Sequence, residues 1–391
     1  GREAMDVLIQ IKESSSVAEL QDIARCVGLG AFDEMHVSLS LSTLLFHLEQ
    51  SGEEALVGEE GHFAEALLHR GGELAHGWSA HTLTTVFKLS ASLGVPPLLP
   101  ALELMFSRAM ALAGGLAPKE VAAFVGAVAD LGVEVGRELM GALQGRVVTL
   151  SAEDPSRFNA QDVLGLLHAF GRMPVAVSPD LGESLQRQAM RSVARYPASA
   201  MPKLLRAVAS LGAAPNWELL EKLQEAAAKA AHLFTAEEVL GMMETVATLG
   251  PTPLPSFVDA MQLRAVQACR DLAPGDILRL MSALAEMGEV PNGALVGAME
   301  GRVVDSIERF GEGELSRLMA ALEKMQVVTS PAFNAAVRPP QPPPTTPTPP
   351  LHPPAGASAL QRAQWAQGAQ WAHGAHGAAA AAREAAAAGR G

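Results

Sequence analysis

The sequence predicts an all-α fold: an α-solenoid of about eight two-helix repeats, each of about 38 residues, with a disordered C-terminal tail. Three observations support this prediction. Apolar residues make up 49% of the chain but aromatic residues only 4%, so Leu, Val, Ala and Met have to form the core, which suits closely packed helices. One segment recurs along the sequence, and the composition changes abruptly after residue 338.

The recurring segment is clearest in the second half of the chain. FTAEEVLGMMETVATLG, which starts at Phe234, aligns without gaps with LAPGDILRLMSALAEMG, which starts at Leu272. Further copies start at Trp78, Leu116, Phe158 and Tyr196, and weaker copies start at His36 and Phe310. The starts from Phe158 onward are 38 residues apart, and the earlier steps are 42, 38 and 42 residues, so short insertions are expected there.

Each copy is predicted to begin with an amphipathic helix. In the Phe234 copy the apolar residues recur with the spacing of one helix face, at Val239, Met242, Met243, Val246 and Leu249. We expect the methionines of this face to lie in the core; they are Met242, Met243, Met281 and Met319.

The ends of these first helices carry capping signals. Thr235 with Glu238, and Asn159 with Asp162, have the spacing of an N-terminal capping box. Prolines in the first turn, where a missing N–H costs nothing, mark two further starts. They are Pro118 and Pro274. A glycine in one register is expected to end five of the helices, at Gly94, Gly132, Gly212, Gly250 and Gly288.

A second helix is predicted after each glycine. Examples are residues 217–232, 255–270 and 293–309. Their apolar frame repeats with the same period, at Leu181, Leu219, Phe257 and Leu295. One hairpin cannot bury its apolar stripe alone, so the copies must stack on one another. A further helix is predicted at Val17–Val27, before the first copy, and the array is expected to span residues 1–338.

Residues 339–391 differ from the array in composition. Ten of the sixteen residues from Pro339 to Pro354 are proline, which favours an extended spacer. Residues 355–391 are rich in Ala, Gly and Gln, and we expect this low-complexity tail to be disordered. Because the chain starts with Gly1 rather than Met, we expect a processed form or a fragment that has no targeting peptide.

The period and the turn between the helices resemble those of the octotricopeptide repeat proteins and, more loosely, the helical repeats that accompany RAP domains. Pro215, Asn216, Trp217 and Glu218 are similar to the proline-rich turn followed by Glu-Trp of the octotricopeptide signature. Two prolines, Pro253 and Pro291, keep the register of that turn, and SVAELQDIARCVGLGAFDEMHVSLSLSTLL looks like the start of such an array. The resemblance implies sequence-selective RNA binding in a mitochondrion or chloroplast, in RNA maturation, stability or translation.

A polar stripe is predicted along the first helices, at three, seven, ten and fourteen residues after each start. Its basic residues are Lys88, Lys119, Arg172, Lys203, Arg206, Arg279, Arg317 and Lys324, and its acidic residues are Asp130, Glu237, Glu244 and Glu286. Residues 1–338 as a whole hold 26 Lys and Arg against 41 Asp and Glu, so the stripe is basic on an acidic body. Because a solenoid stacks its first helices side by side, the stripe would line one groove that could hold a single strand.

The predicted RNA-binding residues are Lys88, His168, Arg172, Lys203, Arg206, Arg279 and Arg317. Imidazole and guanidinium groups can stack on bases or pair with them. The alternative is that these side chains form ordinary solvated helix faces. The net charge of −13 argues against a general nucleic-acid binder, because phosphate contacts need clustered Lys and Arg.

The sequence contains no motif for catalysis, so we expect a protein that is not an enzyme and that has no cofactor and no metal. No Gly-Lys dipeptide occurs, which excludes a Walker A loop, and no G-x-S-x-G motif occurs. His62 and His69 lie two helical turns apart, about 10 Å by helical rise, which is too far to share one metal ion. The isolated Cys26 and Cys269 predict a reducing compartment rather than a disulfide.

Two functions remain open from the sequence. The first, which the resemblance implies, is an organellar protein that binds single-stranded RNA or rRNA, in a mitochondrion or alternatively a chloroplast. The second is a scaffold subunit of a large assembly such as a mitochondrial ribosome, which contacts mainly ribosomal or other organellar proteins; the acidic body favours it. No stretch reaches the 18 continuous apolar residues of a membrane span, so no membrane partner is expected.

Overall fold

The computed structural model describes residues 2–51, 56, 58–154, 156–250 and 252–337. In these ranges it has eighteen α-helices and no strand, which confirms the all-α solenoid. One compact unit extends through Phe333, and of the second unit, which starts at Asn334, only residues 334–337 at the end of the last helix are described. The tail predicted over residues 339–391 lies outside the described residues.

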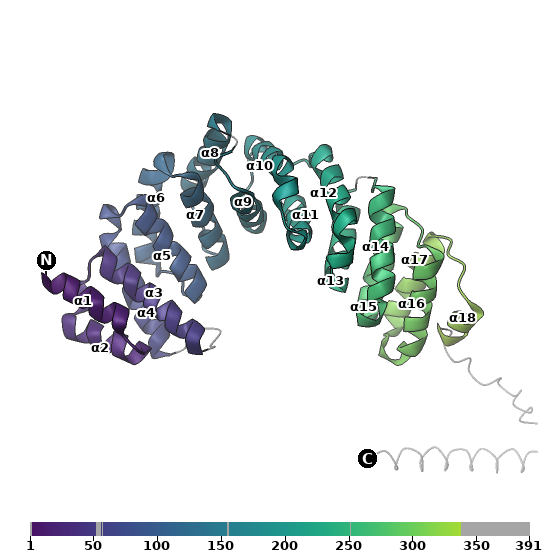
Figure 1. The fold of residues 1–391 in the computed structure, drawn as a ribbon, viewed down its shortest axis with the longest axis horizontal. Helices are drawn as coiled ribbons and strands as arrows, with labels where there is room; N and C mark the ends of the chain where they lie inside the picture. The colour runs from purple at the N-terminus through teal and green to yellow at the C-terminus, as the bar shows by residue number, and fades with distance from the viewer. Residues whose placement is uncertain (1, 52–55, 57, 155, 251, 338–391) are drawn as a thin grey trace, which may run out of the picture. The chain divides into compact units, whose positions relative to one another are not determined.

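The helices of the compact unit form two layers (Figure 1). The odd-numbered helices pack side by side in chain order, and the even-numbered helices do so from α4 to α16. The odd-numbered helices are α1 (Arg2–Glu13), α3 (Glu34–Ser51), α5 (Ala80–Leu93), α7 (Pro118–Leu131), α9 (Ala160–Arg172), α11 (Met201–Ser210), α13 (Ala236–Leu249), α15 (Pro274–Met287) and α17 (Glu312–Lys324). The even-numbered helices are α2 (Val17–Val27), α4 (Glu59–Leu74), α6 (Leu99–Leu112), α8 (Arg137–Glu153), α10 (Pro179–Ser192), α12 (Trp217–Ala230), α14 (Pro255–Ala268), α16 (Gly293–Asp305) and α18 (Pro331–Val337).

Short 3₁₀ turns connect many of these hairpins. They are η1 (Leu29–Ala31), η2 (Ala75–Gly77), η3 (Ala113–Gly115), η4 (Val193–Arg195), η5 (Ala198–Ala200), η6 (Ala231–Leu233), η7 (Cys269–Asp271) and η8 (Ile307–Arg309). All except η5 lie at or just after the end of an even-numbered helix, where tightening of the last turn leads the chain into the next repeat.

The capping signals act as the sequence predicts. The Thr235 hydroxyl accepts the Glu238 N–H at 3.2 Å, and the Glu238 carboxylate accepts the Thr235 N–H at 2.9 Å. Gly250 ends α13 with φ 72° in the left-handed region, where a side chain would be strained. The predicted second-helix frame is buried as well, since Leu181 and Leu219 are fully covered. Local sequence signals therefore set both helices of the repeat.

The first full copy begins four residues earlier than the sequence alignment placed it. The Asp33 carboxylate accepts the backbone N–H of Met35 and of His36, so Asp33 caps α3 and the copy starts at Phe32, not at His36. A shift of four residues is close to one helical turn and keeps the same residues on the buried face. The apolar pattern alone therefore could not distinguish the two starts.

Three other features differ from the prediction. The sequence analysis missed α1, which packs on α3 and makes α1–α2 a further hairpin. Helix α11 begins only at Met201, because Pro202 has no backbone N–H to donate to the Ala198 carbonyl. Met319 is only half-buried, whereas Met242 is fully buried, as predicted.

Buried glutamines tie several repeats to the next one along the chain. Gln262 on α14 donates to the Val290 carbonyl and accepts the Asn292 N–H at 2.7 Å, in the loop between α15 and α16. Gln186 on α10 makes the same pair of bonds to the loop between α11 and α12. The register continues with Gln224 and Glu300, each accepting one loop N–H. These hydrogen bonds satisfy backbone N–H and C=O groups of the loops, which packing between repeats would otherwise bury without a hydrogen-bond partner.

Arginines of the even-numbered helices have a comparable structural role. The Arg264 Nε donates to the Phe234 carbonyl at 2.7 Å, which ties α14 to the start of its own repeat. Arg70 donates to the Phe32 carbonyl at 3.0 Å, and Arg108, Arg146 and Arg302 make the corresponding bond in other repeats. These cations are therefore engaged in holding the repeats together.

Candidate nucleic-acid interface

All the predicted RNA-binding residues lie on odd-numbered helices, and all are exposed. They are Lys88 on α5, His168 and Arg172 on α9, Lys203 and Arg206 on α11, Arg279 on α15 and Arg317 on α17. Because these helices form one layer in chain order, the structure places the predicted stripe on one layer of the solenoid.

Four of these residues form a cluster on two adjacent helices. His168 and Arg172 lie on α9, Lys203 and Arg206 lie on α11, and the two helices are in contact. The pKa of His168 is lowered, first by partial burial and then by the charges of Arg172, Lys203 and Arg206, while Asp130 opposes the shift. The imidazole therefore lies within the electrostatic reach of all three cations. We call these four residues the α9–α11 cluster.

Small residues allow the helices around the cluster to approach closely. A Cβ added to Gly171 on α9 would lie 2.9 Å from the Ser210 Cβ on α11. On the next helix, a Cβ added to Gly241 would lie 2.8 Å from a terminal nitrogen of Arg206. The Arg206 guanidinium thus extends from α11 over α13, in space that any larger residue at position 241 would occupy. The cationic surface reaches across three helices.

Acidic residues of the same layer neutralise two of the predicted arginines. Arg172 pairs with Asp130 on α7 at 2.7 Å. Arg279 binds both carboxylate oxygens of Glu244 on α13 at 2.7 Å, and it binds Asp276 at 3.1 Å. The hydrogen bonds that Arg279 donates to Glu244 are the main cause of a raised pKa of the Arg279 guanidinium. A guanidinium held by two carboxylates is poorly placed to bind a phosphate.

Lys203 and Arg206 differ from these arginines because neither has an ion pair within the described part of the chain. The remaining predicted residues are not brought into the cluster: Lys88 lies on α5, two helices before α9, and Arg317 lies on α17, three helices after α11. Lys203 and Arg206 are therefore unpaired cations beside His168 on α9. Four other basic residues of the stripe have no ion pair among the described residues either: Lys88 on α5, Lys119 on α7, and Arg317 and Lys324 on α17.

The sequence analysis missed the neutralising contacts and a change of chemistry along the layer. Asp276 lies outside the four stripe positions, so its contact with Arg279 was not anticipated. With the start at Phe32, the stripe positions of α3 are Met35, Leu39, Ser42 and Phe46. The corrected start shows that the stripe is not polar at its N-terminal end.

The other predicted absences concern metals and membranes. Among the described residues, no group of three His, Cys, Asp or Glu side chains is arranged to hold a metal ion. The His69 Nε2 lies 3.8 Å from the Glu73 carboxylate, and both side chains are exposed on α4. This arrangement is typical of a solvated helix face. None of the described helices has both the length and the apolar character needed to span a membrane.

A comparison with protein families gives a match over part of the chain. Residues 102–292 match the family profile described as RNA-editing substrate-binding complex 6 protein, and this span runs from α6 through α15 and contains the α9–α11 cluster. A solved structure of an engineered protein matches 86% of this chain and 92% of its own at 10% identity, with a TM-score of 0.21, too low to support an argument. No curated protein matches the chain. The chain is thus similar, over just under half its length, to a family named for a complex that binds RNA-editing substrates.

Proposed function

We propose that this chain is an RNA-associated helical repeat protein that binds single-stranded RNA on the odd-numbered helix layer, centred on α9 and α11. The observation that supports this most is the α9–α11 cluster, which groups His168 with three cations inside the span that matches the RNA-editing substrate-binding family profile. The cluster lies within the matched span, which runs from α6 through α15, so the sequence similarity supports an RNA-associated role for the part of the chain that carries the cluster.

The side chains of the cluster suit an unpaired strand. Lys203 and Arg206 are exposed and have no ion pair among the described residues, so they can neutralise phosphates. Arg172 uses one terminal nitrogen for Asp130 and has further donors for a base edge or a phosphate. His168, whose pKa is lowered, is mostly uncharged at neutral pH and offers a flat ring on which a base can stack. Single-stranded RNA exposes its phosphates and its unpaired bases at the same time.

The finer assignment follows the family resemblance. We propose a role in RNA maturation, stability or translation in a mitochondrion, with a chloroplast as the alternative, and a binding role rather than catalysis. The exposed row of side chains on parallel helices supports binding, because catalysis needs polar groups that converge in an enclosed pocket. Imaging of the tagged protein with organelle markers tests the location, and a cytosolic distribution would contradict it.

RNA binding is tested by fluorescence anisotropy with a labelled single-stranded RNA of about 20 nucleotides, titrated from about 50 to 200 mM salt. We expect measurable affinity whose logarithm falls linearly with the logarithm of salt concentration. Lys203→Ala/Arg206→Ala should weaken binding at least tenfold and reduce the salt slope by about 0.7 for each phosphate that the variant no longer neutralises. The matched control is Lys222→Ala/Lys229→Ala on α12, which removes the same charge from the other layer.

Two results would overturn the proposal. One is no binding at the lowest salt, which would favour the scaffold function, and co-purification with ribosomal particles would then identify the assembly. The other is an equal loss of affinity in the α11 variant and in the α12 control. That result would show that only the net charge of the chain matters and not the position of the cations.

A further inference from the structure

The N-terminal part of the odd-numbered layer is apolar where the central part is cationic. Met35 on α3 is 61% exposed, and Met5 and Ile9 on the neighbouring α1 are 57% and 47% exposed. These side chains belong to two helices in contact, so they form one surface. Exposed apolar side chains that gather in this way mark an interaction site more often than a solvated surface.

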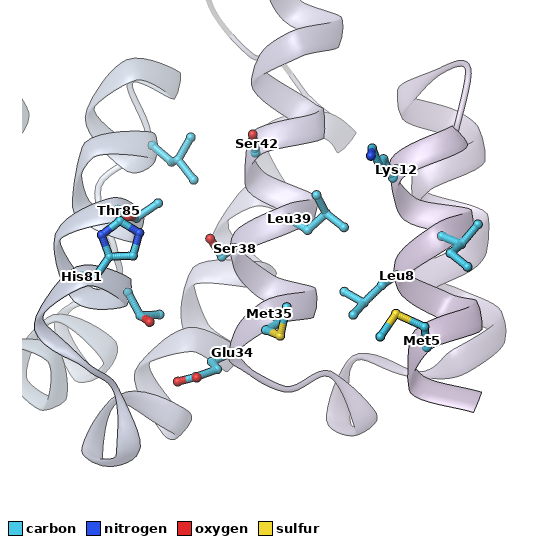
Figure 2. Close-up of a pocket in the computed structure, with 13 residues that line it drawn as sticks. Met5, Leu8, Lys12, Glu34, Met35, Ser38, Leu39, Ser42, His81 and Thr85 are labelled. Carbon is cyan, nitrogen blue, oxygen red and sulfur yellow. The ribbon is translucent and has the colours of Figure 1, made fainter. Parts of the chain in front are cut away.

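A hollow of about 630 Å³ lies on this surface between α1, α3 and α5. Leu8 and Ile9 from α1, Leu39 from α3 and Leu89 from α5 contribute apolar walls. Figure 2 shows Leu8 of α1 and Met35 and Leu39 of α3 in the space between these two helices, and Ser38 and Glu34 on the side of α3 that faces α5. From Met5 to Lys12 the wall is about 10 Å long at the helical rise, so the hollow is long enough for about two turns of another helix.

The charges in the hollow are separated along its length. Lys12 lies near the C-terminal end of α1, and Glu34 is the first residue of α3. Figure 2 shows α1 and α3 running in the same direction, with Lys12 toward one end of the hollow and Glu34 toward the other. Neither side chain has an ion pair within the described residues. A single lysine would serve a phosphate backbone poorly, so RNA is not the favoured occupant.

We propose that the occupant is helix α1 of a second copy of this chain, in a two-fold symmetric dimer. A two-fold axis perpendicular to α1 turns α1 of the second copy antiparallel to α1 of the first. Lys12 of each copy then faces Glu34 of the other, so the same charge contact forms twice. Met5 and Ile9 of each copy fill the hollow of the other. This surface is separate from the α9–α11 cluster and does not depend on RNA binding.

The test is the oligomeric state of the full chain, measured by sedimentation velocity over a roughly hundredfold range of concentration. We expect a reversible dimer. Met5→Gln/Ile9→Gln should shift the chain to monomer, and Lys12→Glu should raise the dissociation constant about tenfold because it places like charges together twice. Lys12→Glu/Glu34→Lys reverses both charges and should restore the dimer. The control is Leu263→Gln, which removes an exposed apolar side chain from α14 in the other layer.

Circular dichroism on each variant shows whether it folds, so a folding defect cannot imitate dissociation. A wild-type chain that is monomeric at every concentration would overturn the proposal. Equal dissociation constants for Lys12→Glu and the double charge reversal would overturn it as well, because the pairing would then not involve Glu34. If the Lys12→Glu variant loses RNA affinity while the oligomeric state is unchanged, the hollow belongs to the RNA-binding surface and not to a dimer interface.

Discussion

The N-terminal and central regions of the odd-numbered layer carry different chemistry on the same positions of the repeat. Seven and ten residues after the start of the repeat, α3 has Leu39 and Ser42, whereas α11 has Lys203 and Arg206. Both helices lie in the odd-numbered layer and pack on equivalent neighbours. The repeat thus determines where a side chain points but leaves its chemistry free. One layer can therefore present an apolar surface in one region and a cationic surface in another.

The two regions share the hydrogen bonds that hold their repeats together. They therefore differ mainly in their exposed side chains. In the N-terminal region, Arg70 donates to the carbonyl that starts its repeat, as Arg264 does further along the chain. Exposed residues make few contacts and can change with little cost in stability, whereas these buried ties cannot. The comparison can be tested by exchanging surface residues while the ties are left intact.

The largest effect is expected from giving the cationic region the side chains of the apolar one. Lys203→Leu/Arg206→Ser transfers the residues of α3 to α11 and removes two cations with no ion pair within the described residues. RNA affinity should fall between about tenfold and a hundredfold. The melting temperature should change little, because both positions are exposed. Binding titrations and thermal melts measure the two quantities.

The control for this exchange is Lys222→Leu/Lys229→Ser on α12. It makes the same chemical change in the even-numbered layer, and its RNA affinity should stay within about threefold of the original. If the α11 variant keeps its affinity, the cationic region is not the RNA site, and the contrast between the two regions has no functional meaning for RNA.

A second prediction concerns the spacing of α9 and α11. Gly171→Ala places a methyl group within 2.9 Å of the Ser210 Cβ, so the helices must separate, and the free energy of unfolding should fall by about 1–3 kcal/mol. The same change at Gly165, also on α9, meets no atom within 4 Å and should raise stability by up to about 1 kcal/mol. Urea denaturation of both variants measures the difference. Equal effects would show that α9 and α11 do not approach closely at Gly171.

The features that the sequence predicted correctly are local. Thr235 and Glu238 of the capping box are three positions apart, and a helix face repeats every turn, so both can be read without knowledge of the packing. The buried glutamines were also visible, since Gln186, Gln224 and Gln262 are 38 residues apart. Their burial was not predicted, because a polar residue in a helix is ordinarily assigned to the surface.

The features that the sequence could not supply depend on contacts between repeats. Arg279 and Glu244 are 35 residues apart, and their bidentate pairing follows from how α13 and α15 pack. The stripe therefore appeared more cationic than it is. A residue pattern shows which side chains share a layer, but only the packed layer shows which charges cancel. The start of the first copy at Phe32 was missed for the related reason that a four-residue shift preserves the buried face.

The neutralising pairs give a third, smaller prediction. Glu244→Gln removes the carboxylate that binds Arg279 and leaves that arginine more available for phosphate. RNA affinity should rise by about threefold to tenfold, and the salt slope should become steeper by about 0.7. Glu221→Gln on α12 makes the same change of charge in the other layer and should have a smaller effect. Equal increases in both variants would indicate a response to net charge alone.

The smallest expected effect is a pH dependence that arises from His168. Burial and three cations lower its pKa below the usual 6.5, so the unfolded chain binds this proton more readily than the folded chain does. The histidine therefore reduces the free energy of unfolding as the pH falls through 6.5, and this loss is absent above that value. A bound phosphate would favour the charged imidazole, so RNA affinity should rise a few-fold as the pH falls from about 7.5 to 5.5. Anisotropy titrations of the original chain and of His168→Gln isolate the effect of this residue from the other histidines. If the variant shows the same pH dependence, His168 does not contact the RNA, and the site has to be sought further along α11 and α13.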